Sequence, residues 1–398
     1  MGKKTVIIII PYLSGGGAER AAINLAENIK NDYNISFILF DADKNSYDFD
    51  KSINIINLNI KSSKNVLGKI KNTLKKYFEI KKIKKHLKVD VSISFLREPN
   101  FINVITKQKN EKTIVSIRNT MSELDDSKMK KFMTKFGGKK ADKVVAISKM
   151  VKKDQIDKYG VDENKIEVIY NACNLDKVKK MANEKIEDKK INEIIENNQG
   201  YIVMNIGRLT YQKGQDKLIR AFKKVVKEVK NAKLLIFGKG ELKEELQELI
   251  KSLELENNVI LAGFYDNPYK FLKKANIFAF SSMFEGLGNI LLEAMACRVP
   301  IISTDCPYGP REIIAPNSDL ESHAENIEEA EYGILVPVLH NDKNKDKLTK
   351  QEEIIANAII KLLKDNKKRK EYAEKSAERI KFFTMEKNKK EWEDIIEN

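Results

Sequence analysis

The segment from Glu285 to Glu293 carries two glutamates and two glycines in a pattern that suits an anionic ligand. It follows an apolar strand pattern and runs into an apolar helix pattern. The first backbone N–H groups of a helix have no intrahelical partner, and with the helix dipole they bind phosphate groups. Gly286 and Gly288 would let such a ligand approach the backbone closely. Glu285 precedes the helix and Glu293 lies about two turns inside it, so they could contact opposite ends of one ligand. The alternative interpretation is an ordinary helix start that Glu285 caps.

Residues 207–214 form a second candidate segment, which again follows a strand pattern and precedes a helix pattern. It begins at Gly207 and contains the cations Arg208 and Lys213. Two fixed cations neutralise a departing diphosphate without a metal ion. A solvated arginine and lysine on a surface loop is the alternative interpretation.

The turn after the first strand pattern carries Gly15, Gly16 and Gly17 and is the third candidate. A dinucleotide site would require Gly-x-Gly-x-x-Gly and an acid after the next strand, where Asp41 stands. Arg20 occupies the position of the last glycine, so the motif is broken and a nicotinamide oxidoreductase is disfavoured. We expect only that a substrate closely approaches the helix that follows.

These segments need strands to position them, and apolar runs rich in valine and isoleucine recur in both halves of the chain. Runs of this kind, alternating with helical patterns, are typical of parallel sheets covered on both faces. Open α/β sheets bind ligands beyond the carboxyl ends of their strands, so we expect the ligand in a cleft between the halves. The expected strands are 5–10, 35–40, 90–95, 113–117 and 143–147, then 201–206, 233–237, 258–262, 277–280 and 299–303.

The polar, lysine- and glutamate-rich stretch 171–198 separates the two halves and indicates a linker with some helix. We therefore expect one domain over residues 1–170 and a second domain over residues 199–380. The tail shows apolar residues at helical spacing, and we expect residues 381–398 to pack back on the first domain.

The chain has 398 residues and a formal net charge of +15, which favours an anionic partner. Residues 61–88 hold eleven lysines against one acid, Glu79. An amphipathic helix here would place one apolar face beside the lysines, for docking on anionic lipid or as a solvated helix packed on the core. Nucleic-acid binding would explain the positive charge but no other feature of the sequence. No zinc-finger spacing and no aromatic RNA-binding signature is present, so it is disfavoured. The apolar face consists of Leu67, Ile70, Leu74, Tyr77 and Phe78.

No apolar run reaches the ~18–20 residues needed to span a bilayer, and no cleavage site follows the first strand pattern. We expect a cytoplasmic protein, peripheral on the inner face of the membrane. The three cysteines and three histidines lack the spacing of metal ligands, so neither metal nor other cofactor is expected.

Taken together and in this order, the segments resemble glycosyltransferase family 4, retaining sugar transferases with the GT-B fold of two Rossmann-like domains. The resemblance covers nearly the whole chain. It rests on Gly16 to Arg20, residues 168–171, residues 207–214, residues 237–241 and the two glutamates Glu285 and Glu293.

The resemblance implies that residues 1–170 bind the acceptor and that residues 199–380 bind the nucleotide sugar. It also implies roles residue by residue. Arg208 and Lys213 would hold the donor diphosphate, Glu285 the sugar hydroxyls and Glu293 the ribose. Arg118 stands where many relatives carry a histidine, whose role cannot be carried over, and is expected instead to contact donor sugar or an anionic acceptor. Arg311, in the loop 305–312, is expected to face the cleft and contact sugar or acceptor. The other expected donor contacts are Gly16, Gly17, Gly207, Gly238, Phe264, Gly286, Leu287, Gly288 and Asn289.

The implied reaction moves a hexose or N-acetylhexosamine from a nucleoside diphosphate sugar, expected to be a UDP-sugar, to a glycan acceptor. A lipid-linked acceptor in surface polysaccharide assembly is expected, and the anomeric configuration would be retained. A GT-B epimerase, which needs no acceptor sugar, is the alternative. A phosphorylase is disfavoured because no motif for a lysine-bound pyridoxal cofactor is present.

Overall fold

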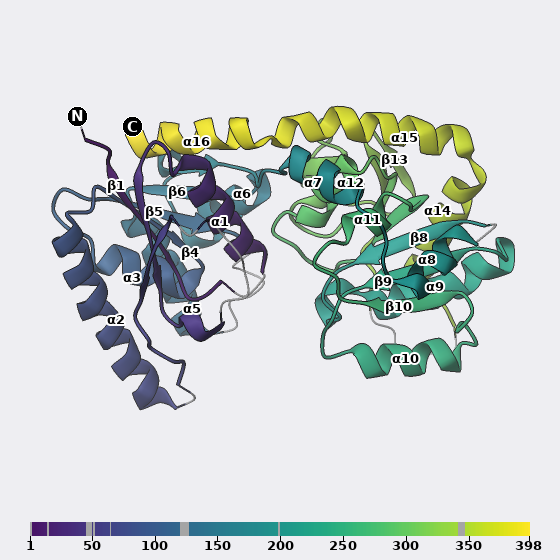
Figure 1. The fold of residues 1–398 in the computed structure, drawn as a ribbon, viewed down its shortest axis with the longest axis horizontal. Coiled ribbons are helices and arrows are strands. Elements are labelled where there is room, and N and C mark those ends of the chain that lie inside the picture. The colour runs from purple at the N-terminus through teal and green to yellow at the C-terminus, as the bar shows by residue number, and fades with distance from the viewer. Residues whose placement is uncertain are drawn as a thin grey trace. The chain divides into compact units, whose positions relative to one another are not determined.

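The computed structural model divides the chain into two compact units, Met1–Ala172 with Met385–Asn398, and Cys173–Thr384 (Figure 1). Each unit is described by itself. The structure describes residues 2–13, 16–44, 50, 52–63, 65–119, 127–197, 200–340 and 347–398.

The described strands of the first unit form one parallel sheet of seven strands in the order β3-β2-β1-β4-β5-β6-β7. Chain order reverses beside β1, which pairs with β2 on one side and β4 on the other. The strands are β1 (Thr5–Ile10), β2 (Asn34–Leu39), β3 (Asn54–Asn57), β4 (Val91–Phe95), β5 (Lys112–Ile117), β6 (Lys143–Ala146) and β7 (Ile166–Val168).

Both faces of this sheet are buried, which explains the nearly continuous apolar strands. Successive side chains of β1 point to opposite faces. Ile8 packs in the core shared with α1 (Gly17–Ile29) and α16 (Met385–Glu397), while Ile9 packs in the core shared with α2 (Val66–Leu87) and α3 (Arg97–Ile105).

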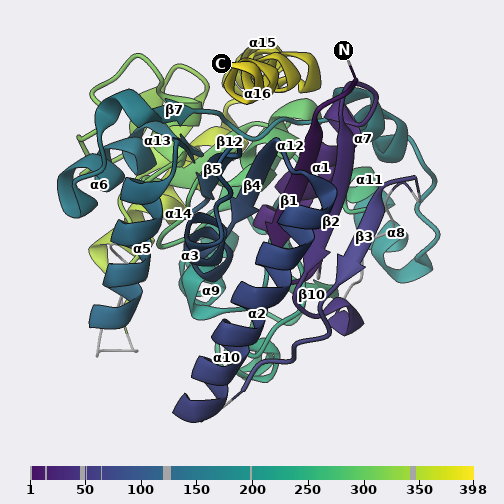
Figure 2. The same cartoon turned by 90° about the vertical axis from the view of Figure 1, so that its left-hand side faces the viewer.

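On the second face, α3 lies between α2 and α5 (Lys128–Lys140) (Figure 2). The helix α6 (Lys149–Tyr159) packs beside α5. Short 3-10 turns lie at η1 (Ala42–Lys44) and η2 (Glu163–Lys165).

The C-terminal helix α16 belongs to the first unit and packs on the sheet face that α1 also covers. Trp392 is buried, and its ring lies 6.3 Å from that of Phe95. Asn388 donates to the carbonyl of Tyr170 at 2.8 Å, and Lys4 pairs with Glu397 at 2.7 Å.

The described strands of the second unit form another sheet of seven, in the order β10-β9-β8-β11-β12-β14-β13. The pairs are parallel except for β13 with β14. The strands are β8 (Ile202–Ile206), β9 (Lys233–Phe237), β10 (Val259–Gly263), β11 (Ile277–Phe280), β12 (Ile301–Thr304), β13 (Glu328–Ala330) and β14 (Gly333–Val336).

Apolar residues of α9, α10 and α14 pack together on the sheet in one core, while α12 packs against α7 and α15. A 3-10 turn, η3 (Tyr211–Lys213), precedes α9, and η4 (Ile380–Phe383) follows α15. The helices are α7 (Leu175–Ala182), α8 (Lys189–Glu196), α9 (Gln215–Glu228), α10 (Lys243–Ser252), α11 (Tyr269–Leu272), α12 (Asn289–Ala296), α13 (Pro310–Ile314), α14 (Lys350–Lys364) and α15 (Asn366–Arg379).

Residues 171–198 were expected to form a linker with some helix. The helices in this stretch, α7 and α8, instead belong to the second unit. Val178 of α7 and Ile191 of α8 are buried. Asp188 accepts a hydrogen bond from the Tyr265 hydroxyl at 2.5 Å, and Asn267 donates to the carbonyl of Met181 at 2.8 Å. Amphipathic helices with capped ends therefore cover part of this unit.

Candidate functional site

The point where strand order reverses in the second unit lies between β8 and β11, which are neighbours in the sheet. The chain runs outward from β8 through β9 to β10 and then crosses back to β11. Ligands of open α/β sheets bind at the carboxyl ends of the strands beside such a point. Residues 207–214 follow β8 and residues 281–288 follow β11, so the fold brings both predicted segments to this position.

Lys213 and Glu285 form an ion pair across this point, with side chains 17% and 12% exposed. The loops that carry them are joined by further hydrogen bonds. The Met283 N–H donates to the carbonyl of Gln212, and the Gln212 side chain donates to the carbonyl of Phe284, both at 2.8 Å. These bonds fix the position of the pair.

Gly214 shows how closely the two loops approach each other. Its φ is +60°, and a Cβ placed there would lie 2.4 Å from the carbonyl oxygen of Ser281. The Ser281 hydroxyl in turn donates to the carbonyl of Lys213 at 2.7 Å. The glycine is therefore required by packing of one loop on the other.

The helix α12 begins at Asn289, with Gly288 as its N-cap at φ +88°. Glu293 is consequently the fifth residue of α12, just over one turn inside, and the expected depth of about two turns is wrong. Asn289 and Glu293 are four residues apart and share one face of the helix. Both are half-buried, whereas Gly286 and Leu287 before them are buried.

Arg208 is exposed at the carboxyl end of β8, and it forms no ion pair with any residue that the structure describes. The neighbouring Gly207 lies against the Lys213 side chain, whose nearest carbon would be 3.4 Å from an added Cβ. Gly238, with φ +151°, would place a Cβ 1.8 Å from the carbonyl oxygen of Gly207. Gly238 thus lets the loops after β8 and β9 touch through their backbones.

Phe264 follows β10, two strands from β8, and its side chain is 55% exposed. The Lys239 ammonium lies 4.4 Å from the centre of its ring. An exposed aromatic ring at the carboxyl ends of parallel strands is suited to stacking against a base.

Arg311 requires a correction, because its charge is used inside the second unit. Its guanidinium hydrogen bonds to Asp305, Glu328 and Ser318 at distances between 2.5 and 3.2 Å. Burial alone would lower the pKa of Arg311, but these carboxylates outweigh burial and raise it. Every N–H of the side chain is engaged, so the expected contact of Arg311 with sugar or acceptor is replaced by a structural role.

Cys306 is a residue near the site for which the sequence suggested no role. It is 2% exposed, and burial raises the pKa of its thiol well above the usual value, with the nearby charge of Glu285 adding to the effect. The thiol is therefore neutral at physiological pH.

In the first unit, Gly16 is the N-cap of α1 and Gly17 its first residue. Glu19 is buried, and its carboxylate oxygen would lie 2.0 Å from a Cβ at Gly16. A side chain at position 16 would therefore displace the Glu19 carboxylate from its position at the helix start.

Arg118 lies just beyond β5 and is 6% exposed. It donates to the Ser116 hydroxyl at 3.3 Å and to the Asn171 side chain, and its guanidinium carbon lies 5.6 Å from the centre of the Phe95 ring. Its Nε, although buried, has no hydrogen-bond partner.

Comparison with known proteins decides which family has this arrangement. The family described as glycosyl transferases group 1 matches residues 186–379, and glycosyltransferase family 4 matches residues 15–177. An uncharacterized glycosyltransferase of Methanocaldococcus jannaschii is 38% identical over 86% of this chain and 87% of its own. The chain belongs to glycosyltransferase family 4. The family predicted from the sequence is confirmed.

Another relative of this glycosyltransferase comes from Campylobacter jejuni and is 31% identical, with 94% of both chains covered. It is named as an N-acetylgalactosamine-N,N'-diacetylbacillosaminyl-diphospho-undecaprenol 4-alpha-N-acetylgalactosaminyltransferase. The crystal structure of Anabaena HepE in complex with UDP matches with a TM-score of 0.76 at 18% identity, covering 99% of both chains. The predicted GT-B fold of two parallel-sheet α/β units is thereby confirmed.

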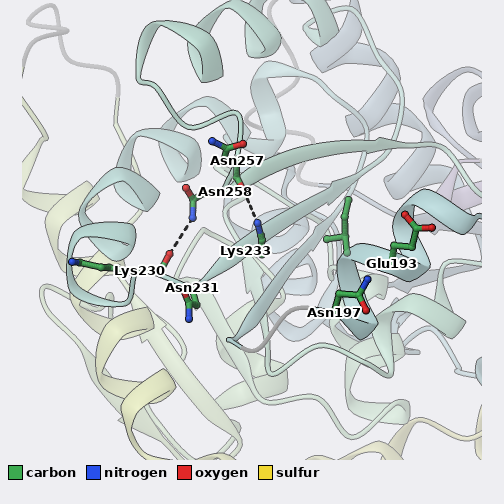
Figure 3. Close-up of a pocket in the computed structure, with 8 residues that line it drawn as sticks. Glu193, Asn197, Lys230, Asn231, Lys233, Asn257 and Asn258 are labelled. Atoms are coloured by element: carbon green, nitrogen blue, oxygen red, sulfur yellow. Dashed lines mark hydrogen bonds between the residues drawn. The ribbon is translucent and has the colours of Figure 1, made fainter.

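A separate surface pocket of the glycosyltransferase lies at the opposite edge of the second sheet (Figure 3). Its residues lie in α8 or directly after it, at the first position of β9, or in the turns before β9 and β10, and none is a predicted site residue. Lys233 donates to the carbonyl of Asn257 at 2.6 Å, and Asn258 donates to that of Lys230 at 3.3 Å. Its polar groups thus bond to one another, and it lies away from the carboxyl ends of the strands.

No helix within the described ranges of the glycosyltransferase is long and apolar enough to cross a membrane.

Proposed function

We propose that this glycosyltransferase moves a hexose or N-acetylhexosamine from a UDP-sugar to a lipid-linked glycan, with retention of the anomeric configuration. The observation that carries the proposal is the Lys213–Glu285 pair beside the start of α12, at the reversal point of the second sheet. A cation, a carboxylate and the N–H groups at a helix start are what a sugar diphosphate requires.

Each group near the pair has a proposed role. Lys213 and the exposed Arg208 would neutralise the diphosphate, and the backbone at Gly288 would donate to it. Glu285 would accept hydrogen bonds from the sugar hydroxyls. Glu293 would accept them from the ribose.

The base would lie farther along the same edge of the sheet. Phe264 offers an exposed ring there, with Lys239 over it, and Gly238 borders the same edge. We propose uracil as the base.

The reaction would need orientation and charge stabilisation in place of a general base. In same-face attack the departing phosphate oxygen takes the proton of the acceptor hydroxyl while the glycosidic bond to phosphate breaks. Lys213 and Arg208 would stabilise the negative charge that develops on the leaving diphosphate. We propose that no metal ion takes part.

The acceptor class is supported by the Campylobacter jejuni relative, whose name includes a sugar linked to diphospho-undecaprenol. An acceptor anchored in lipid would require the enzyme to work at a membrane surface. We therefore propose that the protein is peripheral on the cytoplasmic face of an anionic membrane.

The helix α2 supports membrane docking by the way it lies in the first unit. The face with Lys76, Ile80 and Lys84 is buried against that unit, and Lys76 and Lys84 pair with Glu98 and Glu111. Its other face exposes an apolar stripe among six exposed lysines. The stripe consists of Val66, Leu67, Ile70, Leu74 and Phe78, each at least 54% exposed.

A second helix adds to this surface, and the sequence had not indicated it. Met129 and Phe132 of α5 are 66% and 52% exposed. They are three residues apart on a helix with six lysines and no acid. Apolar side chains surrounded by lysines on two helices fit a surface of anionic lipid.

The test incubates the protein with UDP-glucose, UDP-N-acetylglucosamine and UDP-N-acetylgalactosamine, with and without a prenyl-diphosphate-linked N-acetylhexosamine. Nuclear magnetic resonance of the products reports the anomeric configuration. We expect sugar transfer that depends on the acceptor and gives the α-anomer. Conversion of the donor without acceptor would support the epimerase instead, and a β-linked product would contradict retention.

A further inference from the structure

Arg118 is a buried cation at the carboxyl edge of the sheet of the first unit, where β5 ends. It uses two donor groups, toward the Ser116 hydroxyl and the Asn171 side chain. Both acceptors are neutral. Its Nε is buried and has no partner, so the guanidinium retains N–H groups that could bind a ligand.

Arg311 of the same chain shows how a buried arginine is normally accommodated. It is 5% exposed, nearly the same as Arg118, but it is held by Asp305 and Glu328. No carboxylate in the described part of the chain pairs with Arg118. Burial lowers the pKa of Arg118 to about 9, with no opposing charge, and at neutral pH the group stays protonated. A buried charge without a counter-ion is unfavourable.

The surroundings of Arg118 contain a second unpartnered group. Asn100, in the first turn of α3, donates to the carbonyl of Ser116 at 3.1 Å, but its own Oδ1 is buried without a partner. Leu96, the N-cap of α3, has φ +75°, a strained conformation that structures often keep at functional sites. An unpartnered donor and an unpartnered acceptor thus flank Ser116.

We propose that Arg118 binds the carboxylate or phosphate of a substrate, and that Asn100 accepts a hydrogen bond from a hydroxyl beside that group. The anion supplies the opposite charge that no described residue provides, and the hydroxyl pairs with the unpartnered amide oxygen. The inference rests on the proposed transferase function. It adds that one of the two substrates carries an anionic group beyond the donor diphosphate, either an acidic donor sugar or an acceptor phosphate.

The test compares the wild type with Arg118→Met, using Lys140→Met as a control that removes an exposed cation of the same unit. Titration calorimetry measures binding of UDP, UDP-glucose, UDP-glucuronic acid and farnesyl diphosphate. If the anion belongs to the donor, UDP-glucuronic acid binds the wild type at least ten-fold tighter than UDP-glucose, and Arg118→Met abolishes that preference. If the anion belongs to the acceptor, Arg118→Met weakens the binding of farnesyl diphosphate at least ten-fold and leaves the binding of UDP-glucose and UDP-glucuronic acid unchanged.

A stability measurement separates binding from a structural role. Without anions, Arg118→Met should melt at the same temperature as the wild type or higher, because an uncompensated buried charge is replaced by an apolar side chain. Inorganic phosphate should raise the melting temperature of the wild type and of Lys140→Met, relative to equal ionic strength of chloride, but not that of Arg118→Met.

Three outcomes overturn the inference: equal binding of every anionic probe by wild type and Arg118→Met, a lower melting temperature of Arg118→Met, or failure of that variant to fold. UDP binding serves as the reference. If the wild type and Arg118→Met bind UDP equally, these outcomes contradict the role of Arg118 and leave the proposed donor site unaffected. If the wild type binds no UDP, the proposed donor itself is wrong.

Discussion

Lys213 and Glu285 are 72 residues apart in the chain and form an ion pair where the strand order of the second sheet reverses. The loops on either side of the pair are hydrogen-bonded to each other, so the two charges are held together by backbone as well as by attraction. A single substitution does not test either residue by itself, because removing one leaves the charge of the other without its partner. This coupling shapes how the site must be tested.

Glycine positions beside the site give a prediction with a matched control. Gly238→Ala and Gly263→Ala both place a side chain at positive φ, which costs roughly 1–2 kcal/mol in left-handed backbone. The added Cβ would lie 1.8 Å from the Gly207 oxygen in Gly238→Ala, but it meets nothing within 4 Å in Gly263→Ala. We expect Gly238→Ala to lower the free energy of unfolding further and to weaken UDP binding, as measured by urea unfolding and calorimetry.

If Gly238→Ala and Gly263→Ala unfold at the same urea concentration and bind UDP equally, the close approach of the two loops is not part of the donor site.

The buried pair of Lys84 and Glu111 gives a prediction about pH. Both side chains are fully buried, with their charged atoms 2.6 Å apart. Burial lowers the pKa of Lys84 from 10.5 to about 8, against the opposing effect of Glu111. Between these pH values the unfolded chain holds more protons than the folded one, so the free energy of unfolding rises with pH.

The comparison is with Lys84→Met/Glu111→Leu, which replaces the pair by apolar residues and lacks this titration. Urea unfolding from pH 7 to pH 10 should show the wild type gaining stability relative to the double variant above about pH 8. Loss of relative stability over that range would contradict the direction of the shift. Lys84→Met alone should cost about 3–5 kcal/mol at pH 7, because it leaves a buried carboxylate unpaired.

Much of the fold could be predicted because its strands are buried on both faces, as the apolar runs of β1 and β11 illustrate. The strands that were missed are short or carry polar residues: β7 has three residues, and β3 begins and ends with asparagine. The helices α7 and α8 lie in a stretch whose polar composition hides their few apolar contacts.

The site was predicted in part for a similar reason. Segments that follow neighbouring strands must meet at one edge of a sheet, which places Lys213 near Glu285. The partners of Arg311 could not be foreseen, because Glu328 comes from a three-residue strand 17 positions away. The surroundings of Arg118 were equally hidden, since no sequence pattern reports that the described part of the fold places no carboxylate beside it.

The exposed stripe on α2 predicts binding to anionic membranes. The triple variant Leu67→Ser/Ile70→Ser/Phe78→Ser should keep its stability, because these side chains are 80%, 54% and 65% exposed. It should bind phosphatidylglycerol vesicles at least ten-fold more weakly than the wild type in a sedimentation assay. Each lysine near such a surface adds roughly 1 kcal/mol, so wild-type binding should also fall as salt is raised.

The control for the vesicle assay is Phe382→Ser, which removes a half-exposed aromatic ring from the second unit. It should bind like the wild type. Equal wild-type binding to phosphatidylcholine vesicles, or no binding to anionic vesicles at low salt, would exclude this surface as an anionic-lipid site.

The most direct test of the donor site is the rate of sugar transfer by Lys213→Ala, Glu285→Ala and the double variant. Lys361→Ala serves as a control, because it breaks the more exposed pair with Glu329. We predict that each single variant keeps its fold and loses at least ~100-fold in transfer rate, as expected for groups that stabilise transition-state charge. The double variant should lose much less than the product of the two, since the residues act as a unit. Near-normal transfer by both single variants, with unchanged stability, would contradict the assignment of the site.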